Sequence, residues 1–406
     1  MTKFGALFLV ASCVFCSGAD RLDVTRVEPE AAGMDAQRLS AIPVRMQEFV
    51  DAKQAAGMVT IVSRHGKVAS FEAVGYQDLE SKTAMRKDSL FRIASLTKPI
   101  TCAGIMVLVD EGRLSVIDPV EKYLPEYKGL KVRTCDGRIG YGCDGVQPSR
   151  PMNIEDLMTH TSGLESSSAL PGGAVATTLA ELASAGASSQ LLFQPGTRWN
   201  YSNTGYDILG RIIEVISKQP YEEFIKRHLF DPLQMNDSYF FVPETKMDRL
   251  ATLYSLDNGR VVRSKNQLSA EHGPKIPRPA GGVVSSAADM FRFNMMMRNK
   301  GVLDGQRVLS EGAVALMTVN HTGDMKAGWA PGVGHGYGYE VVRNADGMFR
   351  YNSLGSFVKG GAFRTYEWVD PEKDLVGVFM MQRTNGGGDT ADEINAFMAM
   401  SAAAIK

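Results

Sequence analysis

The segment Ser95-Leu-Thr-Lys98 places a hydroxyl and an amine three residues apart, which is about one turn of a helix. A serine hydroxyl is a weak nucleophile at neutral pH and needs a neighbouring base. A lysine amine can supply that base when burial or a second cation lowers its pKa below the free value of about 10.4. The spacing therefore indicates a nucleophile, Ser95, with Lys98 as its partner. The alternative is a helix cap followed by a solvated lysine, because a chain of this length contains roughly one or two such spacings by chance.

The residues around this pair predict that Ser95 lies at the N-terminus of a helix. Asp88 and Ser89 precede it, and an apolar run, 100–109, follows. Pro99 fits only the first turn of a helix, which agrees with this placement. Backbone N–H groups and the helix dipole at that position favour negative charge that develops during a reaction.

A second candidate group lies in the segment Trp-Asn-Tyr-Ser-Asn over 199–203, between a Gln-Pro-Gly turn and a helix predicted to start at Tyr206. Tyr201 can act as a base once nearby cations stabilise its phenolate. Asn203 can hold a lysine or orient a substrate carbonyl. The alternative is a loop in which Asn203 caps the next helix.

A third candidate group is the sequence Lys359-Gly360-Gly361-Ala362, which is predicted to open a strand. Glycines let a substrate approach the backbone closely. A backbone N–H of an edge strand here can donate to a developing oxyanion, together with the N–H at Ser95. The alternative is an ordinary bulge or turn.

Taken in this order, the three groups resemble the serine β-lactamase and penicillin-binding-protein superfamily. The resemblance is closest to class C β-lactamase-like enzymes and to family VIII carboxylesterases. Further matching pieces are spread along most of the chain: Gly112-Arg-Leu, Asp118-Pro-Val-Glu-Lys-Tyr-Leu-Pro, His160-Thr-Ser-Gly-Leu, Gln194-Pro-Gly, Pro279-Ala-Gly-Gly and Trp368-Val-Asp-Pro-Glu-Lys-Asp-Leu-Val-Gly-Val.

The resemblance implies a role for each candidate residue. Ser95 attacks an acyl carbon and forms an acyl-enzyme, while Lys98 and Tyr201 share the proton transfers. The N–H groups of Ser95 and Ala362 form the oxyanion hole. The implied substrate-binding residues are Asn203, Lys359, Gly360 and Gly361. The resemblance implies neither a metal nor an organic cofactor.

One departure from the lactamase pattern bears on the substrate. Lactamases carry Lys-Thr-Gly at the third motif, and here Gly360 replaces the threonine that helps hold the β-lactam carboxylate. We therefore expect a carboxylesterase acting on short-chain acyl esters, although Lys359 keeps carboxylate recognition open. The alternatives are a β-lactamase or D-Ala-type peptidase, an acyltransferase with an alcohol acceptor, and a non-catalytic penicillin-binding-like sensor. No Gly-x-Ser-x-Gly elbow is present, which argues against an α/β-hydrolase.

His160 raises a separate question, because a serine–histidine pair is the commoner hydrolase arrangement. In the resembled family the His-Thr-Ser-Gly-Leu segment is a structural turn after a helix, so we expect His160 to be structural. Met295 to Met297 and Cys102 are expected to pack in the core.

The predicted elements give an α+β architecture. A helix over 35–53 and strands over 58–62 and 68–76 open the chain. Strands over 337–342, 357–369 and 375–382 and a helix over 389–404 close it. We expect the two ends, 20–91 and 330–406, to share one antiparallel sheet flanked by the terminal helices. Helices over 97–111, 206–217, 221–229 and 287–297 make the inserted part, 92–329, largely helical, and 20–406 is expected to be a single hydrolase domain.

The N-terminus predicts export. Lys3, an apolar run over 4–16 and the small residues Ser-Gly-Ala before residue 20 are typical of a cleaved signal peptide, 1–19. The alternative is a lipoprotein anchored through Cys13, because a lipobox-like sequence ends at that residue. In the periplasm or outside the cell, Cys135 and Cys143 could close a loop disulfide or remain free thiols.

The composition narrows the class of partner. The chain has 406 residues, 44% of them hydrophobic, and a net charge of -1. It carries no block of like charges, so we expect a small acyl ester or amide as partner and no nucleic acid. No stretch is predicted to span a membrane stably, and the oligomeric state is left open.

Overall fold

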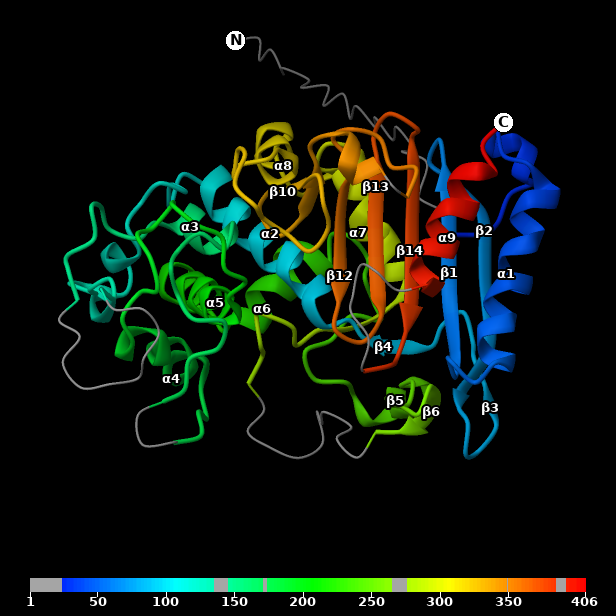
Figure 1. Ribbon diagram of the computed structural model, residues 1–406, viewed down its shortest axis with the longest axis horizontal. Helices are drawn as coiled ribbons and strands as arrows, with labels where there is room; N and C mark the ends of the chain where they lie inside the picture. Colours follow the sequence, from blue (N-terminus) through cyan, green and yellow to red (C-terminus); the bar gives the residue numbers. More distant parts are fainter. Residues whose placement is uncertain (1–23, 135–144, 171–173, 265–275, 349, 385–391) are drawn as a thin grey trace, which may run out of the picture.

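A computed structural model describes residues 24–134, 145–170, 174–264, 276–348, 350–384 and 392–406 (Figure 1). The predicted signal peptide and the Cys135–Cys143 pair lie outside these residues. Within them, no helix combines the length and the apolar character needed to cross a membrane.

Strands from both ends of the chain form one sheet of eight strands in the described residues, in the order β10-β11-β12-β13-β14-β1-β2-β3. The central pair joins the two ends, since β14 runs antiparallel to β1 from Met58 opposite Met381 to Arg64 opposite Leu375. The predicted shared antiparallel sheet is therefore confirmed. The strands of this sheet are β1 (Gly57–Arg64), β2 (Lys67–Asp78), β3 (Thr83–Ala84), β10 (Val333–His335), β11 (Glu340–Val342), β12 (Phe357–Gly361), β13 (Thr365–Asp370) and β14 (Leu375–Met381).

In the part of the chain that the structure describes, three short pairs of strands lie outside this sheet. Their members are β4 (Leu90–Arg92) with β7 (Val284–Ser286), β5 (Tyr254–Asp257) with β6 (Arg260–Arg263), and β8 (Val302–Leu303) with β9 (Gln306–Arg307). The hairpin of β5 and β6 was not among the elements predicted from the sequence.

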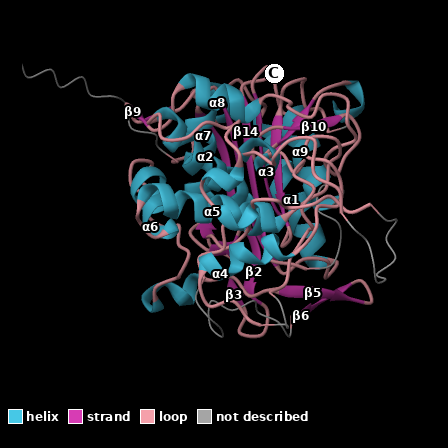
Figure 2. Ribbon diagram, turned by 90° about the vertical axis from the view of Figure 1, so that its left-hand side faces the viewer, coloured by secondary structure: helices cyan, strands magenta, loops and turns pink. Residues whose placement is uncertain are grey.

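The helices separate into two groups around the sheet (Figures 1 and 2). The terminal helices, α1 and α9, contact each other and pack on one face, and α7 packs on the other. In Figure 2 helices of the middle region lie in front of the strands. The helices are α1 (Ala36–Asp51), α2 (Thr97–Asp110), α3 (Ile154–Met158), α4 (Leu179–Ser184), α5 (Asn203–Ser217), α6 (Tyr221–Ile225), α7 (Ala287–Arg298), α8 (Glu311–Thr318) and α9 (Asp392–Ala403).

Strand β1 shows why the sheet is buried on both faces. Alternate side chains of a strand point to opposite faces. Met58 and Val62 pack with α1 and α9, whereas Val59 and Ile61 pack in the core of the helical side. Because both faces are covered, β1 is buried continuously from Gly57 to Ser63 rather than alternating between buried and exposed positions.

Two of the predicted strands were wrong in extent. The run 357–369 is a hairpin, because the chain reverses after Gly361 and Arg364 takes the left-handed conformation, with φ of 65°. No Pro or Asn marks that turn, which is why the strand-like pattern of the sequence predicted one continuous strand across it. The run 337–342 is strand only from Glu340, because Gly338, with φ of 84°, lies in the turn between β10 and β11.

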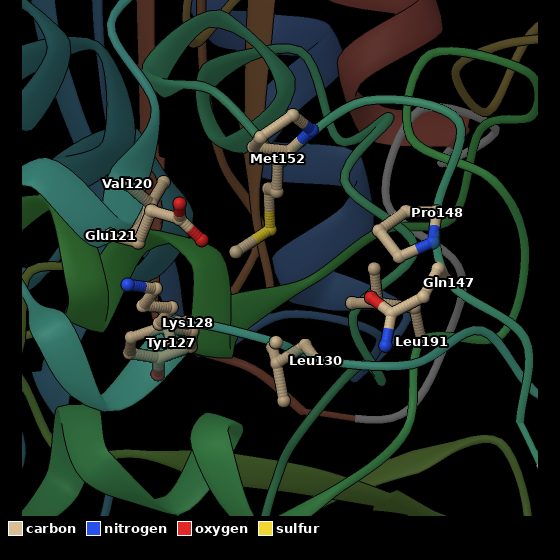
Figure 3. A pocket seen from close by; sticks show the side chains of 11 residues that line it. Val120, Glu121, Tyr127, Lys128, Leu130, Gln147, Pro148, Met152 and Leu191 are labelled. Carbon is tan, nitrogen blue, oxygen red and sulfur yellow. The ribbon is translucent and has the colours of Figure 1, made fainter.

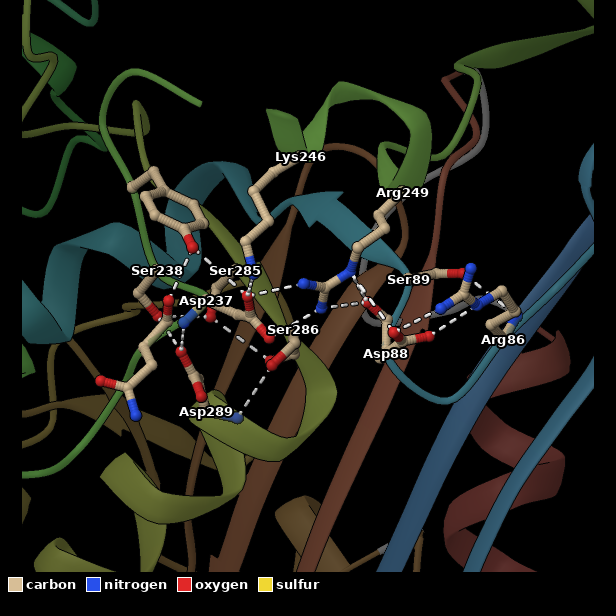
Figure 4. Close-up of polar contacts among 12 residues, drawn as sticks. Arg86, Asp88, Ser89, Asp237, Ser238, Lys246, Arg249, Ser285, Ser286 and Asp289 are labelled. Atoms are coloured by element: carbon tan, nitrogen blue, oxygen red, sulfur yellow. Dashed lines mark hydrogen bonds and ion pairs between the residues drawn. The ribbon is translucent and has the colours of Figure 1, made fainter. Parts of the chain in front are cut away.

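Strand β4 leads directly to Ser95 and is anchored by a polar network (Figure 4). Arg249 donates to the carbonyl oxygen of Asp88 at 2.9 Å and to Asp237 Oδ1 at 2.8 Å. Asp289, in the first turn of α7, accepts from the N–H of Asp237 at 2.7 Å and from the hydroxyl of Ser238 at 2.8 Å. The network thus ties the segment before β4 to a core helix.

Candidate active site

Ser95 lies in a one-turn 3-10 helix, Ala94–Leu96, that continues directly into α2. Ala94 has a left-handed φ of 48°, and the turn is held at its base, where the N–H of Ile93 donates to the carbonyl oxygen of Val283 at 3.0 Å. The hydroxyl of Thr365 on β13 donates to the carbonyl oxygen of Ile93 at 2.9 Å. Ser95 therefore lies at the helix N-terminus, half-buried, between the helical region and the sheet.

Lys98 is fully buried one turn further along. Its Nζ donates to Ser95 Oγ at 3.2 Å, to Asn203 Oδ1 at 2.9 Å and to the carbonyl oxygen of Ala280 at 2.6 Å. These three acceptors match the three N–H bonds of an ammonium group. Burial lowers the pKa of Lys98 well below its ordinary value, and the nearby charge of Lys359 lowers it further. The solvated-lysine alternative is thus wrong, and Lys98 releases its proton more readily than a lysine in water does.

Tyr201 brings a second proton-carrying group to Ser95. Its hydroxyl donates to Ser95 Oγ at 2.7 Å. The Nζ atoms of Lys98 and Lys359 lie 4.7 Å and 5.4 Å from the centre of its ring. Two cations beside one phenol favour negative charge on its oxygen. Ser95 Oγ is therefore within hydrogen-bond reach of two groups that can take its proton.

Asn203 is the first residue of α5, and its side chain faces Lys98 rather than the helix end. The cap is Ser202, whose hydroxyl accepts from the N–H of Gly205 at 3.1 Å. The interpretation of Asn203 as a helix cap is therefore wrong. The helix also starts at Asn203 rather than at Tyr206, because Ser202 supplies the cap.

The prediction that the Lys359 segment opens a strand is wrong. Strand β12 ends with Lys359, Gly360 and Gly361. Lys359 is buried and lies opposite Glu367 of β13. A side chain on Gly361 would overlap Thr365 Oγ1 and lie 2.5 Å from the carbonyl oxygen of Ile93, so the backbone of β12 closely approaches the turn that carries Ser95. Ala362 follows directly, which places it beside that turn.

The last residues of β12 are open on one side, although β12 is not the edge strand that the sequence predicted. Strand β11 lies next to it, and in the described ladder β11 pairs only with Phe357 and Val358. Among the residues that the structure describes, no strand lies beside Lys359 to Gly361 on the side that faces away from β13. An acyl group could therefore lie along this part of the strand, beside Ser95.

The comparisons with known proteins agree with this arrangement. A family model described as Beta-lactamase matches residues 45–399. The chain belongs to the beta-lactamase family. With that family, the chain falls in the serine hydrolase superfamily.

This beta-lactamase family chain is 34% identical over 359 residues to Protein Rv1367c of Mycobacterium tuberculosis. That alignment covers 83% of this chain and 88% of the relative. It is 32% identical over 270 residues to Esterase EstB of Burkholderia gladioli, which covers 63% of each. Among solved structures, EstCE1, titled a hydrolase with promiscuous acyltransferase activity, has a TM-score of 0.75 at 22% identity. That alignment covers 92% of this chain and 98% of EstCE1, and it shows the same fold.

His160 of this beta-lactamase family member has a structural position. It is fully buried, and its Nδ1 accepts from the N–H of Ser202 at 3.0 Å. The centre of its ring lies 4.4 Å from the centre of the Tyr201 ring, so the imidazole packs against the tyrosine. Burial lowers the pKa of His160 well below its ordinary value and keeps the imidazole neutral. Ser95 Oγ accepts hydrogen bonds from Lys98 and Tyr201, whereas His160 bonds the backbone of Ser202, which agrees with the expected structural role.

Three contributors to the site were missed at the level of sequence. The carbonyl oxygen of Ala280 accepts from Lys98, and His335 packs its ring 4.9 Å from that of His160. Trp329 lies 5.4 Å from Tyr201, ring centre to ring centre. The Pro-Ala-Gly-Gly motif over 279–282 was a usable signal for Ala280. Trp329 lies in a loop that no periodicity identifies, and His335 ends the short strand β10.

A cavity of about 290 Å³ lies apart from these residues (Figure 3). It is lined by Val120, Glu121, Tyr127, Lys128, Gly129, Leu130, Gln147, Pro148, Pro151, Met152 and Leu191, and none of these belongs to the candidate site. Among the described residues no group of three or more His, Cys, Asp or Glu side chains is arranged to hold a metal ion.

Proposed function

We propose that the protein is a serine carboxylesterase that forms an acyl-enzyme on Ser95. The observation that carries the proposal is the position of Ser95 Oγ, 2.7 Å from the Tyr201 hydroxyl and 3.2 Å from Lys98 Nζ. Both partners lie within the distance that direct proton transfer requires.

The proposed reaction has two halves. Ser95 Oγ attacks the ester carbonyl while its proton passes to the Tyr201–Lys98 pair, and the N–H groups of Ser95 and Ala362 stabilise the oxyanion. The intermediate collapses, the pair returns the proton to the leaving alcohol, and an acyl-enzyme remains. Water then attacks the acyl-enzyme in the same way and releases the acid.

An ester substrate is supported by the third motif and by one relative. Gly360 leaves no hydroxyl where lactamases have the threonine that helps bind a lactam carboxylate. A related chain of similar sequence is named an esterase. One observation favours a second candidate, a β-lactamase or D-Ala-type peptidase: the buried cation Lys359 beside Tyr201 could pair with a substrate carboxylate.

The experiment compares a short-chain nitrophenyl ester with a chromogenic cephalosporin, on the wild-type protein and on Ser95→Ala. Ser40→Ala removes an exposed hydroxyl from α1 and serves as the matched control. We expect ester turnover that Ser95→Ala abolishes and Ser40→Ala preserves, with little lactam turnover. Dominant lactam turnover would replace the ester by the second candidate, and undiminished ester turnover in Ser95→Ala would refute the mechanism.

A further inference from the structure

Trp329 is a large aromatic side chain exposed beside the candidate catalytic tyrosine. It is 59% exposed. Its ring centre lies 5.4 Å from that of Tyr201 and 5.6 Å from that of Trp199, and the two tryptophan rings meet edge to face. An exposed tryptophan presents apolar area at the cost of ordering only two side-chain torsions.

The loop that carries Trp329 is held in place. Its N–H donates to Glu340 Oε2, a buried carboxylate on β11, at 3.3 Å. Gly328 precedes it with φ of 74°, and a side chain there would lie 2.6 Å from Val333 and 3.0 Å from Glu340 Oε2. The indole is thus presented by a fixed backbone, which lowers the entropy lost when a ligand packs against it.

The position of Trp329 relative to Tyr201 decides which half of an ester it would meet. In the proposed reaction the leaving oxygen must receive its proton from the group that took the proton of Ser95. Tyr201 and Lys98 are those groups, so the leaving alcohol lies on the Tyr201 side of Ser95. The carbonyl oxygen of the ester would instead point toward the N–H groups of Ser95 and Ala362.

We propose that Trp329 is a specificity-determining residue that binds the alcohol part of the substrate and selects apolar, aromatic alcohols. The inference rests on the proposed function and deepens it by naming the class of alcohol. Aromatic pairs in offset or edge-to-face contact add to the free energy gained by burial alone. Benzyl-type esters should therefore react faster than ethyl esters of the same acid.

The same surface can bind an incoming alcohol. Deacylation is the reverse of acylation, except that the attacking oxygen comes from the acceptor instead of the original leaving alcohol. The acceptor hydroxyl gives its proton to the Tyr201–Lys98 pair, and its oxygen forms a bond with the acyl carbon. The bond from that carbon to Ser95 Oγ breaks, and the pair returns the proton to Ser95. An aromatic alcohol held on Trp329 thus competes with water for the acyl-enzyme, and the products are a new ester and free enzyme.

The test compares benzyl acetate with ethyl acetate, which form the same acyl-enzyme, on the wild-type protein, Trp329→Ala and Trp329→Phe. Tyr351→Ala is the control, because Tyr351 is also an exposed aromatic residue, 63% exposed, but it precedes β12 at the end opposite Gly361. We expect Trp329→Ala to lower kcat/KM for benzyl acetate at least 10-fold and for ethyl acetate less than 2-fold. Trp329→Phe should recover most of the loss, and Tyr351→Ala should change neither value.

A binding measurement separates this inference from the proposed function. Saturation-transfer NMR of benzyl alcohol is recorded on Ser95→Ala with and without Trp329→Ala, and we expect the signal to fall when Trp329 is removed. Equal loss or no loss for the two esters, or an undiminished NMR signal, would overturn the role of Trp329. If Ser95→Ala hydrolyses esters like the wild-type protein, the proposed function fails, and the NMR comparison then decides the binding role alone.

Discussion

At the residue scale, the chemistry of this site depends on the protonation of one buried lysine. Lys98 donates to three oxygen atoms from three separate segments, those of Ser95, Asn203 and Ala280. Desolvation disfavours its charged form, and the acceptors around it keep the amine directed at Ser95. A group at this position must be able to lose its proton as well as carry it.

Replacement of Lys98 by arginine tests that requirement. A guanidinium keeps a positive charge and can donate to the same oxygens, but it does not lose its proton in proteins. We expect Lys98→Arg to lower kcat/KM for a nitrophenyl ester by about 10²–10⁴-fold, the usual contribution of an acid–base group. Lys226→Arg, an exchange at an exposed ion pair, is the control. Retention of half the activity in Lys98→Arg would contradict the assignment.

Lys359 should set the pH at which activity appears. Its charge helps to lower the pKa of Lys98, so the neutral amine forms at a lower pH than it would without Lys359. Activity rises as pH increases through the pKa of Lys98. Removal of the cation in Lys359→Met raises that pKa, and the acid limb of the profile of kcat/KM against pH should move to higher pH.

The position of the limb, rather than its height, is the readout for Lys359, because this residue is also a candidate for substrate binding. Lys326→Met removes the same charge from an exposed position and should leave the limb in place. A limb that stays fixed or moves to lower pH in Lys359→Met would refute the electrostatic role.

At the element scale, the site depends on how closely β12 approaches the turn before α2. Thr365 on β13 bonds the carbonyl oxygen of Ile93, and Gly361 leaves room for that contact. These two residues set the spacing between Ser95 and Ala362, the two proposed oxyanion donors. Such donors act only when their distance from the oxyanion is right to a fraction of an ångström.

Gly361→Ala should therefore damage activity. The added methyl group would lie 2.5 Å from the carbonyl oxygen of Ile93 and would overlap Thr365 Oγ1, so β12 must shift away from Ser95. We expect kcat to fall at least about 10-fold, since loss of one oxyanion donor costs about 10²–10³-fold. Gly312→Ala in α8, where the nearest atom is Ser310 Oγ at 3.8 Å, should leave kcat unchanged. Equal kcat values in the two variants would contradict this account.

At the scale of the whole molecule, the sheet carries an ionisable group in its core. Glu367 on β13 is fully buried and accepts from Asn294 Nδ2 of α7 at 2.9 Å. Burial raises the pKa of Glu367 from an ordinary 4.5 to about 8. The folded state therefore binds a proton on this carboxyl that the unfolded chain releases above its own pKa.

Stability should consequently decrease with increasing pH. The contribution of Glu367 is fully present below about pH 4.5 and is lost as pH rises through about 8. We expect the free energy of unfolding to fall between pH 5 and 9 by about 2–4 kcal/mol more in the wild-type protein than in Glu367→Gln. Urea unfolding at the two pH values measures the difference, and Glu372→Gln at an exposed position is the control. The same pH dependence in all three proteins would show that Glu367 stays ionised.

Features that depend on local backbone geometry were determined by the sequence itself. Ser95 and Lys98 lie together because three residues along a helix return to the same side. The helix of α1 follows its apolar spacing from the Asp35 cap, and the continuous apolar run of β14 reflects a sheet covered on both faces. The recurring motifs along the chain indicated the family that the comparisons show.

The tertiary structure alone decided which distant residues complete the site. Tyr201 is 106 positions from Ser95, and Ala280 is 182 positions from Lys98. Their meeting depends on how α5 and the 279–282 segment pack on α2, and no local periodicity encodes that packing. The burial that lowers the pKa of Lys98 and the placement of Trp329 over Tyr201 have the same origin. Residues far apart in the sequence meet only in the packed core, because solvent exclusion and long-range contacts arise together there.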